Sequence, residues 1–403
     1  MKLRTLFTIV FVQASLLQNV WAFSTRRDVD ITGEQRIQVR VNSFGYPLEE
    51  HFVQTADGYI LAVHRIPHGR ETGDTKQPRK IVFLMHGLLC SSNDWILAGP
   101  EKGLAFLLVD AGYDVWMGNA RGNTYSRNHA WLTPKGSEFW SFSWHEIGVF
   151  DLPAMIDYVL EQTRETSLHY IGHSQGTTSF FVMSSVRPEY GQKIKVMHAL
   201  APVAFMSNAP SPFFKALAPL VGSAGTMEKL FGSHEFMPNS ELFEIGGSLL
   251  CKDEALTQDL CANVLFLISG FDSENLNKTM IPDIMAVTPA GASANQIIHY
   301  AQGSSGKFRF FDYGLVKNTF KYGSLTPPEY TLQAITAPVA LYYGNNDWLA
   351  GVKDVQELAG KLGNLLLKYE IPFPKWNHLD FLWGISAKEL VYDKVMEVMS
   401  AYP

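Results

Sequence analysis

Short apolar runs alternate with helix-like segments along most of this chain, and this alternation restricts the fold more than any other feature. Continuous runs rich in β-branched residues are typical of parallel strands that are buried on both faces. The segments between them repeat apolar residues at helical spacing. The sequence therefore predicts an α/β fold with a mostly parallel sheet. The expected strands are 80–85, 113–117, 168–171, 194–201, 337–344 and 365–371, and the expected helices are 104–111, 150–161, 177–185 and 352–362.

The alternation stops at about residue 202 and resumes after residue 330. The stretch between is rich in Gly and Pro and carries apolar helical segments at 213–221 and 256–267. The strands after it are too few to form a domain, so an insertion into one core is the simplest interpretation, although the length alone also permits two sequential domains. We therefore predict a core of residues 41–205 and 331–403 and a cap of residues 206–330.

The composition excludes several classes of protein. Hydrophobic residues make up 46% of the 403 and charged residues 18%, which supplies a large core and argues against disorder. The net charge is −6 and no tract is rich in Lys or Arg, which argues against nucleic-acid binding. The sequence has no H-E-x-x-H or Walker A pattern, and no G-x-G-x-x-G follows an expected strand. We therefore predict neither a metal nor a cofactor.

The N-terminal residues have the pattern of a secretory signal peptide. Lys2 and Arg4 precede an apolar run of about a dozen residues, which is shorter than the ~20 that cross a bilayer. The segment Val20-Trp21-Ala22 has compact residues at the two positions that signal peptidase recognises. We therefore expect cleavage after Ala22 and removal of residues 1–22. Residues 23–40 are polar and are expected to form a loose arm or a propeptide. No other stretch is apolar enough to span a membrane, so the sequence predicts a soluble, secreted protein.

Secretion into an oxidising compartment sets the expectations for the three cysteines. Cys251 and Cys261 are close in sequence and are expected to form a disulfide. Cys90 is then left as a free thiol, most simply a buried one. Asn277 begins the sequon Asn-Lys-Thr, so it is expected to be glycosylated at the surface.

The segment Gly172-His173-Ser174-Gln175-Gly176 matches the G-x-S-x-G pattern of a nucleophile elbow. In such a turn the serine hydroxyl is presented above the sheet edge, and the glycines let neighbouring backbone approach closely. About 0.2 chance matches are expected in a chain of this length, so the pattern alone is moderate support. It gains weight because an expected strand precedes it and a helix of small residues follows it. We therefore predict Ser174 as a nucleophile in an elbow with Gly172, His173 and Gly176.

A serine hydroxyl needs a general base, and in folds of this type the chain order is serine, acid, histidine. His378 follows the last expected strand, in the loop 373–378, and is predicted to be the base. Three other histidines follow Ser174 and suit this role less well: His198 in an expected strand, and His234 and His299 in the insertion.

The acid is expected at the C-terminal end of a strand between the serine and the histidine, because catalytic groups gather at those ends in open α/β sheets. Asp347 stands there, shortly after the expected strand 337–344, and is predicted to orient the imidazole. Its rivals are Asp354, placed by pattern on the next helix, and Asp272 and Asp283 in the insertion.

The tetrahedral intermediate of acyl transfer needs two backbone N–H donors. The residue after the nucleophile, Gln175, is predicted to supply one of them. Leu88, in the loop 86–89 after an early strand, is predicted to supply the other. The alternative for His86-Gly87 is an ordinary turn at the end of a strand.

Taken together, these residues resemble the acid lipase family of α/β-hydrolases, which includes gastric, lingual and lysosomal lipases and secreted insect members. The resemblance extends from about residue 40 to the end of the chain. The passages that carry it are 46–50, 55–61, 86–89, 118–123, 144–146, 172–177, 270–272 and 377–381.

The resemblance implies a cofactor-free lipase that cleaves carboxyl esters of acylglycerols or sterols at an oil–water or membrane interface, often in acid. It assigns the triad to Ser174, Asp347 and His378, the oxyanion donors to Leu88 and Gln175, and a lid-region disulfide to Cys251 and Cys261. The single sequon favours secretion over the lysosome, and Cys90 departs from the small residue expected beside the oxyanion loop. A short-chain carboxylesterase and a non-catalytic lipid-binding protein on a lipase fold remain the alternatives.

The resemblance also implies that the insertion is a cap domain bearing a lid. Apolar residues between positions 213 and 221 fall at helical spacing, so this helix is expected to cover the site in water and to open at an interface. The alternative is a fixed cap that lines the acyl pocket.

Overall fold

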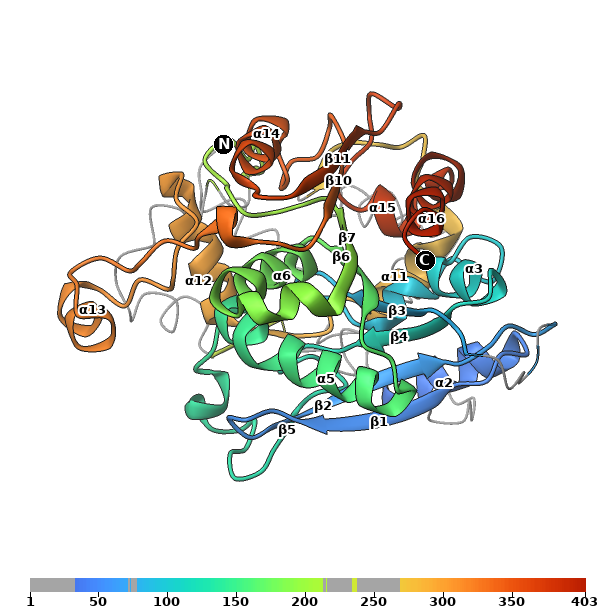
Figure 1. Ribbon diagram of the computed structural model, residues 1–403, viewed down its shortest axis with the longest axis horizontal. Helices are drawn as coiled ribbons and strands as arrows, with labels where there is room; N and C mark the ends of the chain where they lie inside the picture. The colour runs from blue at the N-terminus through green and yellow to red at the C-terminus, as the bar shows by residue number, and fades with distance from the viewer. Residues whose placement is uncertain (1–32, 72, 74–77, 213–214, 216–233, 238–268) are drawn as a thin grey trace, which may run out of the picture.

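The computed structural model describes residues 33–71, 73, 78–212, 215, 234–237 and 269–403, and a mixed β-sheet forms the centre of this part of the chain (Figure 1). The strands follow the order β1-β2-β4-β3-β6-β7-β10-β11, and β5 pairs with β2. From β4 to β11 all neighbours are parallel, whereas β1, β2 and β5 are antiparallel. The strands are β1 (Glu49–Gln54), β2 (Tyr59–Ile66), β3 (Ile81–Met85), β4 (Asp114–Gly118), β5 (Asn128–His129), β6 (Leu168–His173), β7 (Ile194–Leu200), β10 (Val339–Tyr343) and β11 (Leu365–Glu370).

Every strand between β4 and β10 along the sheet is nearly or completely buried, because helices cover this region. Figure 1 shows α5 and α6 lying together over the central strands. A π-helical turn, Ile147–Asp151, precedes α5, and Asp151 is buried there. The principal helices of the core are α3 (Leu104–Asp110), α5 (Leu152–Thr163), α6 (Gln175–Val186), α14 (Val352–Lys361), α15 (Asp380–Trp383) and α16 (Asp393–Ser400).

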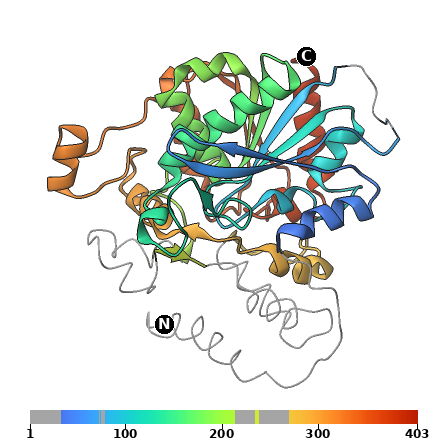
Figure 2. The same cartoon turned by 90° about the horizontal axis from the view of Figure 1, so that it is seen from below.

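The predicted α/β class is confirmed, and the predicted core strands and helices agree with the structure to within about two residues at most ends. The hairpin of β1 and β2 was not anticipated. It adds two antiparallel strands at one edge, and Figure 2 shows it crossing in front of the other strands. Its half-exposed outer strand gives a weaker apolar run than the buried parallel strands do.

Residues 23–40 were predicted to form a loose arm or a propeptide; residues 33–40 are not loose, and the propeptide stays a prediction. Helix α2 (Gly33–Ser43) occupies residues 33–40, and residues 23–32 lie outside the described part of the chain. Ile37 and Val41 are one helical turn apart and are both buried in the core. On the same helix, Arg40 forms an ion pair with Asp283 at 2.8 Å. The packed chain therefore begins before residue 41.

The described part of the insertion packs directly on the core. Buried apolar side chains of α11 and α12 belong to the same cluster as the core strands. The predicted signal peptide 1–22, most of helix 213–221, helix 256–267 and both Cys251 and Cys261 lie outside the described residues. The described elements of the insertion are β8 (Glu235–Phe236), α11 (Ile281–Val287), β9 (Ala292–Ser293), α12 (Ala294–Gln302) and α13 (Leu315–Tyr322).

Among the described residues, no helix is both long enough and apolar enough to cross a bilayer.

Candidate active site

Ser174 occupies the sharp turn between β6 and α6. Its backbone is in a strained conformation, with φ +52° and ψ −115°. A Cβ on Gly176 would lie 2.3 Å from the carbonyl oxygen of Met85, and one on Gly172 would lie 2.8 Å from the backbone of Gly176. Both positions therefore admit only glycine, and the local sequence produces the turn that the elbow pattern predicts.

The structure brings the three predicted triad residues together. His378 Nε2 lies 2.7 Å from Ser174 Oγ, and His378 Nδ1 lies 2.8 Å and 3.0 Å from the two carboxylate oxygens of Asp347. The three residues follow β6, β10 and β11, so the parallel sheet collects them at the C-terminal ends of its strands. All three are buried, with 9% of Ser174 exposed.

The acid and the base are each fixed by further hydrogen bonds. The N–H groups of Leu349 and Ala350 donate to Asp347 Oδ1 at 2.8 Å and 2.7 Å. His173 Nε2 lies 2.9 Å from the carbonyl oxygen of His378. Burial lowers the pKa of His173 well below its ordinary value, so this ring is a neutral donor that holds the backbone of His378.

The rival residues have other partners. His198 contacts the hydroxyl of Tyr342, and His299 bonds the carbonyl of Arg309. Asp354 accepts hydrogen bonds from the backbone and side chain of Asn208. The structure therefore leaves Asp347 and His378 as the acid and histidine that reach Ser174.

The loop that carries Leu88 lies against the nucleophile. A Cβ on Gly87 would lie 3.1 Å from Ser174 Cβ, so this close approach favours glycine. His86 Nε2 accepts from the N–H of Ala120 at 3.0 Å, and His86 Nδ1 then donates to the carbonyl of Gly87 at 2.7 Å. Burial lowers the pKa of His86 to about 4, so a neutral imidazole ties this loop to the segment after β4.

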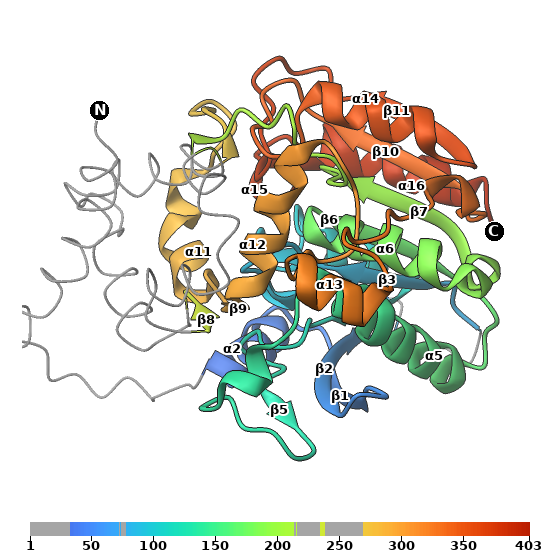
Figure 3. The same ribbon diagram turned by 90° about the vertical axis from the view of Figure 1, so that its left-hand side faces the viewer.

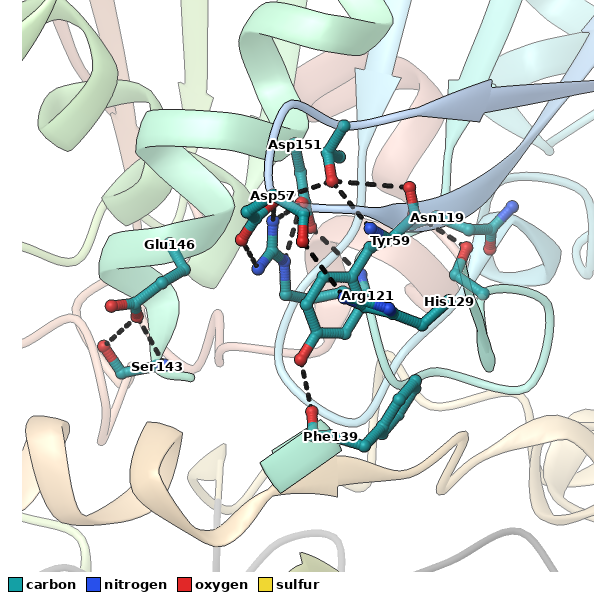
Figure 4. A network of polar contacts seen from close by, with 11 residues as sticks. Asp57, Tyr59, Asn119, Arg121, His129, Phe139, Ser143, Glu146 and Asp151 are labelled. Atoms are coloured by element: carbon teal, nitrogen blue, oxygen red, sulfur yellow. Dashed lines mark hydrogen bonds and ion pairs between the residues drawn. The ribbon is translucent and has the colours of Figure 1, made fainter. Parts of the chain in front are cut away.

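A buried ion cluster anchors the segment after β4 in turn. Figure 4 shows the Arg121 guanidinium between the carboxylates of Asp57 and Asp151. Arg121 donates to Asp57 at 2.6 Å and 2.9 Å, and to Asp151 at 2.7 Å from Nε and 3.0 Å from the backbone. The guanidinium also lies 4.0 Å from the ring centre of Tyr59. We call Arg121, Asp57 and Asp151 the arginine cluster. It connects the β1–β2 turn and the π-helical turn to the segment after β4, which holds the Leu88 loop through His86.

A second set of polar contacts clamps the loops that carry Asp347 and His378. The Asn377 amide donates to the carbonyl of Gly270 at 3.0 Å, and the Asn346 amide donates to the carbonyl of Phe271 at 2.7 Å. Gly270 has φ +115°, and a Cβ there would lie 2.0 Å from the carbonyl oxygen of Asn346. The segment 269–272 of the insertion therefore fits between the two loops only with glycine at this position.

Two buried carboxyl groups complete this clamp. Asp380 Oδ2 accepts from the N–H of Asn377 at 2.7 Å, and the carboxyl group of Asp272 is its close neighbour. Burial, reinforced by the negative charge of Asp272, raises the pKa of Asp380 to about 8 against the opposing Asn377 N–H. Asp380 therefore keeps its proton at neutral pH, and we call these two neighbouring groups the carboxyl pair (Asp272, Asp380).

Apolar side chains surround the Leu88 loop. Phe236, Ile297 and Ala301 form a small buried cluster, and Leu88, Leu89, Met237 and Ile298 pack against it. Helix α12 and strand β8 of the insertion thus supply apolar surface beside the nucleophile.

Sequence reasoning assigned no side-chain role to His86, Arg121 or the carboxyl pair. Their segments do occur among the passages that carry the family resemblance, namely 86–89, 118–123, 270–272 and 377–381. That signal marks the segments without saying which contacts they make, because each contact joins residues far apart in the chain.

The remaining predicted sites make no hydrogen bond to the triad that the structure shows. Asn277 is half-buried at the surface between the exposed Lys278 and the core, and its carboxamide accepts from Thr279. Cys90 is free and buried, and burial raises the pKa of its thiol well above the ordinary value, which suits an inert core thiol. In the part of the chain that the structure describes, no group of three His, Cys, Asp or Glu residues is arranged to hold a metal ion.

The fold and this site define a class, the α/β-hydrolases. The family model described as "alpha/beta hydrolase fold" matches residues 80–385, and the one described as "Partial alpha/beta-hydrolase lipase region" matches residues 37–99. Among solved structures, one from Sulfolobus solfataricus has a TM-score of 0.58 at 13% identity and covers 85% of this chain and 90% of its own. At that identity the likeness concerns the fold alone.

Curated relatives narrow the class to a family. Lipase 3 of Drosophila melanogaster is 50% identical over 90% of this chain and 92% of its own. Gastric triacylglycerol lipase of Bos taurus is 42% identical over 98% of both chains. The human lysosomal acid lipase/cholesteryl ester hydrolase is 39% identical over 100% of both. The chain belongs to the acid lipase family of α/β-hydrolases, as its sequence motifs predicted.

Proposed function

We propose that this acid lipase hydrolyses carboxyl esters of lipids, triacylglycerols foremost, through a Ser174–His378–Asp347 triad. The observation that carries the proposal is the unbroken line of hydrogen bonds from Ser174 Oγ through the His378 imidazole to Asp347, at 2.7 Å and 2.8 Å. The names of the Bos taurus and human relatives support triacylglycerol and cholesteryl ester as the substrates to test.

Each residue has one task in this mechanism. Ser174 Oγ attacks the ester carbonyl while His378 Nε2 takes its proton, and Asp347 stabilises the imidazolium that forms. The N–H groups of Leu88 and Gln175 stabilise the oxyanion, with the Leu88 loop held close by Gly87. His378 returns the proton to the leaving alcohol, and water then releases the fatty acid from Ser174.

The proposal also covers the secretion signal, the covalent modifications and the cap of this chain. We propose that residues 1–22 direct the protein to secretion, that Cys251 and Cys261 form a disulfide, that Asn277 carries a glycan, and that residues 206–330 act as a cap with a lid. Mass spectrometry of the secreted protein under non-reducing and reducing conditions tests the first three together, because cleavage, the disulfide and the glycan each change a peptide mass.

The central experiment measures fatty-acid release from emulsified long-chain triacylglycerol and from cholesteryl ester between pH 4 and 8. We expect Ser174→Ala to lower turnover by at least about 10³-fold, because the nucleophile is lost while the fold remains. Ser179→Ala is the matched control: it is a buried serine of the same helix, and its hydroxyl makes no hydrogen bond within the described residues.

The alternatives give different results. Turnover of a soluble short-chain ester, without turnover of either lipid, would show a carboxylesterase. Binding of lipid without turnover of any ester would show a non-catalytic lipid-binding protein. Equal loss in both serine variants would contradict the assignment of Ser174, since only one of the two touches His378.

A further inference from the structure

Helix α13 has the reverse of the usual distribution of polar and apolar side chains. Its one buried residue is Asn318, while Leu315, Val316 and Phe320 are 64%, 70% and 86% exposed. Leu325, just after the helix, is 61% exposed. A short surface helix normally turns its apolar face toward the core, and within the described residues this apolar face of α13 stays exposed.

The inner side of α13 is a built polar support. The Asn318 amide donates to Asp312 at 2.8 Å and to the carbonyl of Leu325 at 3.0 Å, and its oxygen accepts from the N–H of Tyr313 at 2.9 Å. The Tyr322 hydroxyl donates to the carbonyl of Phe311 at 2.9 Å. These bonds hold the helix and Leu325 together, so the outward apolar side chains are a fixed feature and not a frayed end.

The helix also projects from the body of the protein. Figure 1 and Figure 2 both show α13 at the far left, joined to the core by two extended segments. Its base is tied to α12, because the Gln302 side chain donates to the carbonyl of Asp312 at 2.8 Å and accepts from its N–H at 2.9 Å. Helix α12 in turn packs beside the Leu88 loop, and Figure 3 shows α12 and α13 on the same side of the molecule.

Charged residues flank the apolar face on one side. Val316 and Phe320 are four residues apart and share the outward face, and the exposed Lys317 and Lys321 share the adjacent one. The nearby carboxylate Asp312 accepts from Asn318 and lies 3.6 Å from the Arg309 guanidinium, and the Lys321 ammonium lies 4.4 Å from the ring centre of Tyr313. The exposed charge beside the apolar side chains is therefore positive, which is the pattern of helices that lie in a lipid interface.

The size of this surface distinguishes a lipid from a protein partner. A helix of eight residues is about 12 Å long, whereas a stable protein interface takes roughly 20 to 30 residues and about 800 Å² on each side. Four apolar side chains are too few for that. They suffice at a lipid surface, where each side chain inserts separately and lysine stems extend to the headgroups.

We infer that α13, with Leu325, is an interfacial anchor that inserts Val316 and Phe320 into the surface of the lipid substrate, and that Lys317 and Lys321 bind fatty-acid carboxylates there. This inference rests on the proposed function, because ester hydrolysis is what supplies those carboxylates at the surface. The anchor (Leu315, Val316, Phe320, Leu325) is distinct from the triad and from the apolar cluster beside the Leu88 loop.

The test separates binding from catalysis by using the inactive Ser174→Ala protein. Its partition onto triolein droplets coated with phosphatidylcholine and oleate is measured by flotation, with and without Val316→Ser/Phe320→Ser. We expect the double variant to lower the partition coefficient about tenfold or more, since two exposed apolar side chains lose their insertion into lipid. Phe52→Ser is the matched control, because Phe52 is 57% exposed on β1, away from α13, and should change partition by less than about twofold.

Two further measurements complete the test. Lys317→Gln/Lys321→Gln should weaken flotation with droplets that contain oleate and leave droplets without oleate unchanged. In the active protein, Val316→Ser/Phe320→Ser should leave turnover of a soluble short-chain ester within about twofold, which excludes misfolding. An unchanged partition of the double variant, or an equal loss in Phe52→Ser, would overturn the anchor. Because flotation needs no turnover, failure of the proposed hydrolysis would appear only in the serine experiment.

Discussion

The arginine cluster and the carboxyl pair each hold two acidic side chains beside the active site, all buried except the partly exposed Asp57, yet the two clusters compensate the charge differently. In the arginine cluster, one guanidinium binds Asp57 and Asp151 at 2.6 to 2.9 Å. In the carboxyl pair, Asp380 retains a proton beside Asp272. The first cluster supports the Leu88 loop and the second clamps the loops of Asp347 and His378. The Leu88 loop is thus supported through an ion pair, and the loops of Asp347 and His378 are held by a protonated carboxyl group.

Asp57 and Asp380 therefore respond to pH in opposite directions, whereas burial raises the pKa of Asp151 to about 6 despite Arg121, so Asp151 responds in the same direction as Asp380. Burial acts to raise the pKa of Asp57, but the hydrogen bonds and charge of Arg121 outweigh it and the pKa is lowered. The stability that Asp57 contributes is therefore lost as the pH falls. Asp380, whose pKa is raised to about 8 from an ordinary 3.8, contributes stability that is lost as the pH rises between those values.

The largest effect is expected from removal of the shared cation. Arg121→Met leaves two carboxylates without their partner, of which Asp151 is fully buried and Asp57 partly buried. We expect the free energy of unfolding to fall by about 3 to 5 kcal/mol at pH 7. Urea denaturation measures it. A loss below about 1 kcal/mol, typical of an exposed ion pair, would show that the cluster does not hold this side of the site.

A pH-dependent effect of intermediate size is expected at the carboxyl pair. The folded wild-type protein holds a proton on Asp380 that the unfolded chain releases above pH ~4, so its stability should fall by about 2 to 3 kcal/mol between pH 5 and 7 from this group. Asp380→Asn keeps an acceptor for the Asn377 N–H and cannot ionise, so this part of the decline should disappear. Parallel pH slopes for the two proteins, measured by denaturation at each pH, would refute a proton on Asp380 in the folded protein.

The smallest effect is expected from neutralising one member of the arginine cluster. The Asp57 side chain is 28% exposed, and Asp151 remains to compensate Arg121. Asp57→Asn should therefore lower the free energy of unfolding by about 1 kcal/mol at pH 7, and its loss relative to wild type should shrink only as the pH falls below about 4. A loss as large as that of Arg121→Met would mean that Asp57, and not the charge of Arg121, supplies most of the stability of the arginine cluster.

How well each feature could be predicted from the sequence depends on how far apart its residues lie along the chain. The elbow of Ser174 was found because a strand, two glycines and a helix within a few residues produce it locally. Asp347 and His378 were found because the ends of parallel strands meet at one edge. The β1–β2 hairpin and the packing of α2 were missed, since a half-exposed edge strand and a helix with two buried residues leave weak patterns.

The exposed face of α13 has a clear helical pattern, but the sequence does not predict that this face points away from the core. The spacing of Val316 and Phe320 is an ordinary helical pattern, and a sequence alone favours burial for it. Asn318 reverses that outcome by bonding Asp312, Tyr313 and the carbonyl of Leu325 on the inner side.

The sequence by itself determined the α/β class, the nucleophile turn and the order of serine, acid and histidine, because short-range periodicity and glycine geometry govern them. Only the tertiary structure decided which carboxyl groups meet Arg121, which keep a proton, and which apolar side chains face outward. Those outcomes depend on burial and on distances between distant segments, and a buried charge changes its free energy with every neighbour that the fold brings to it.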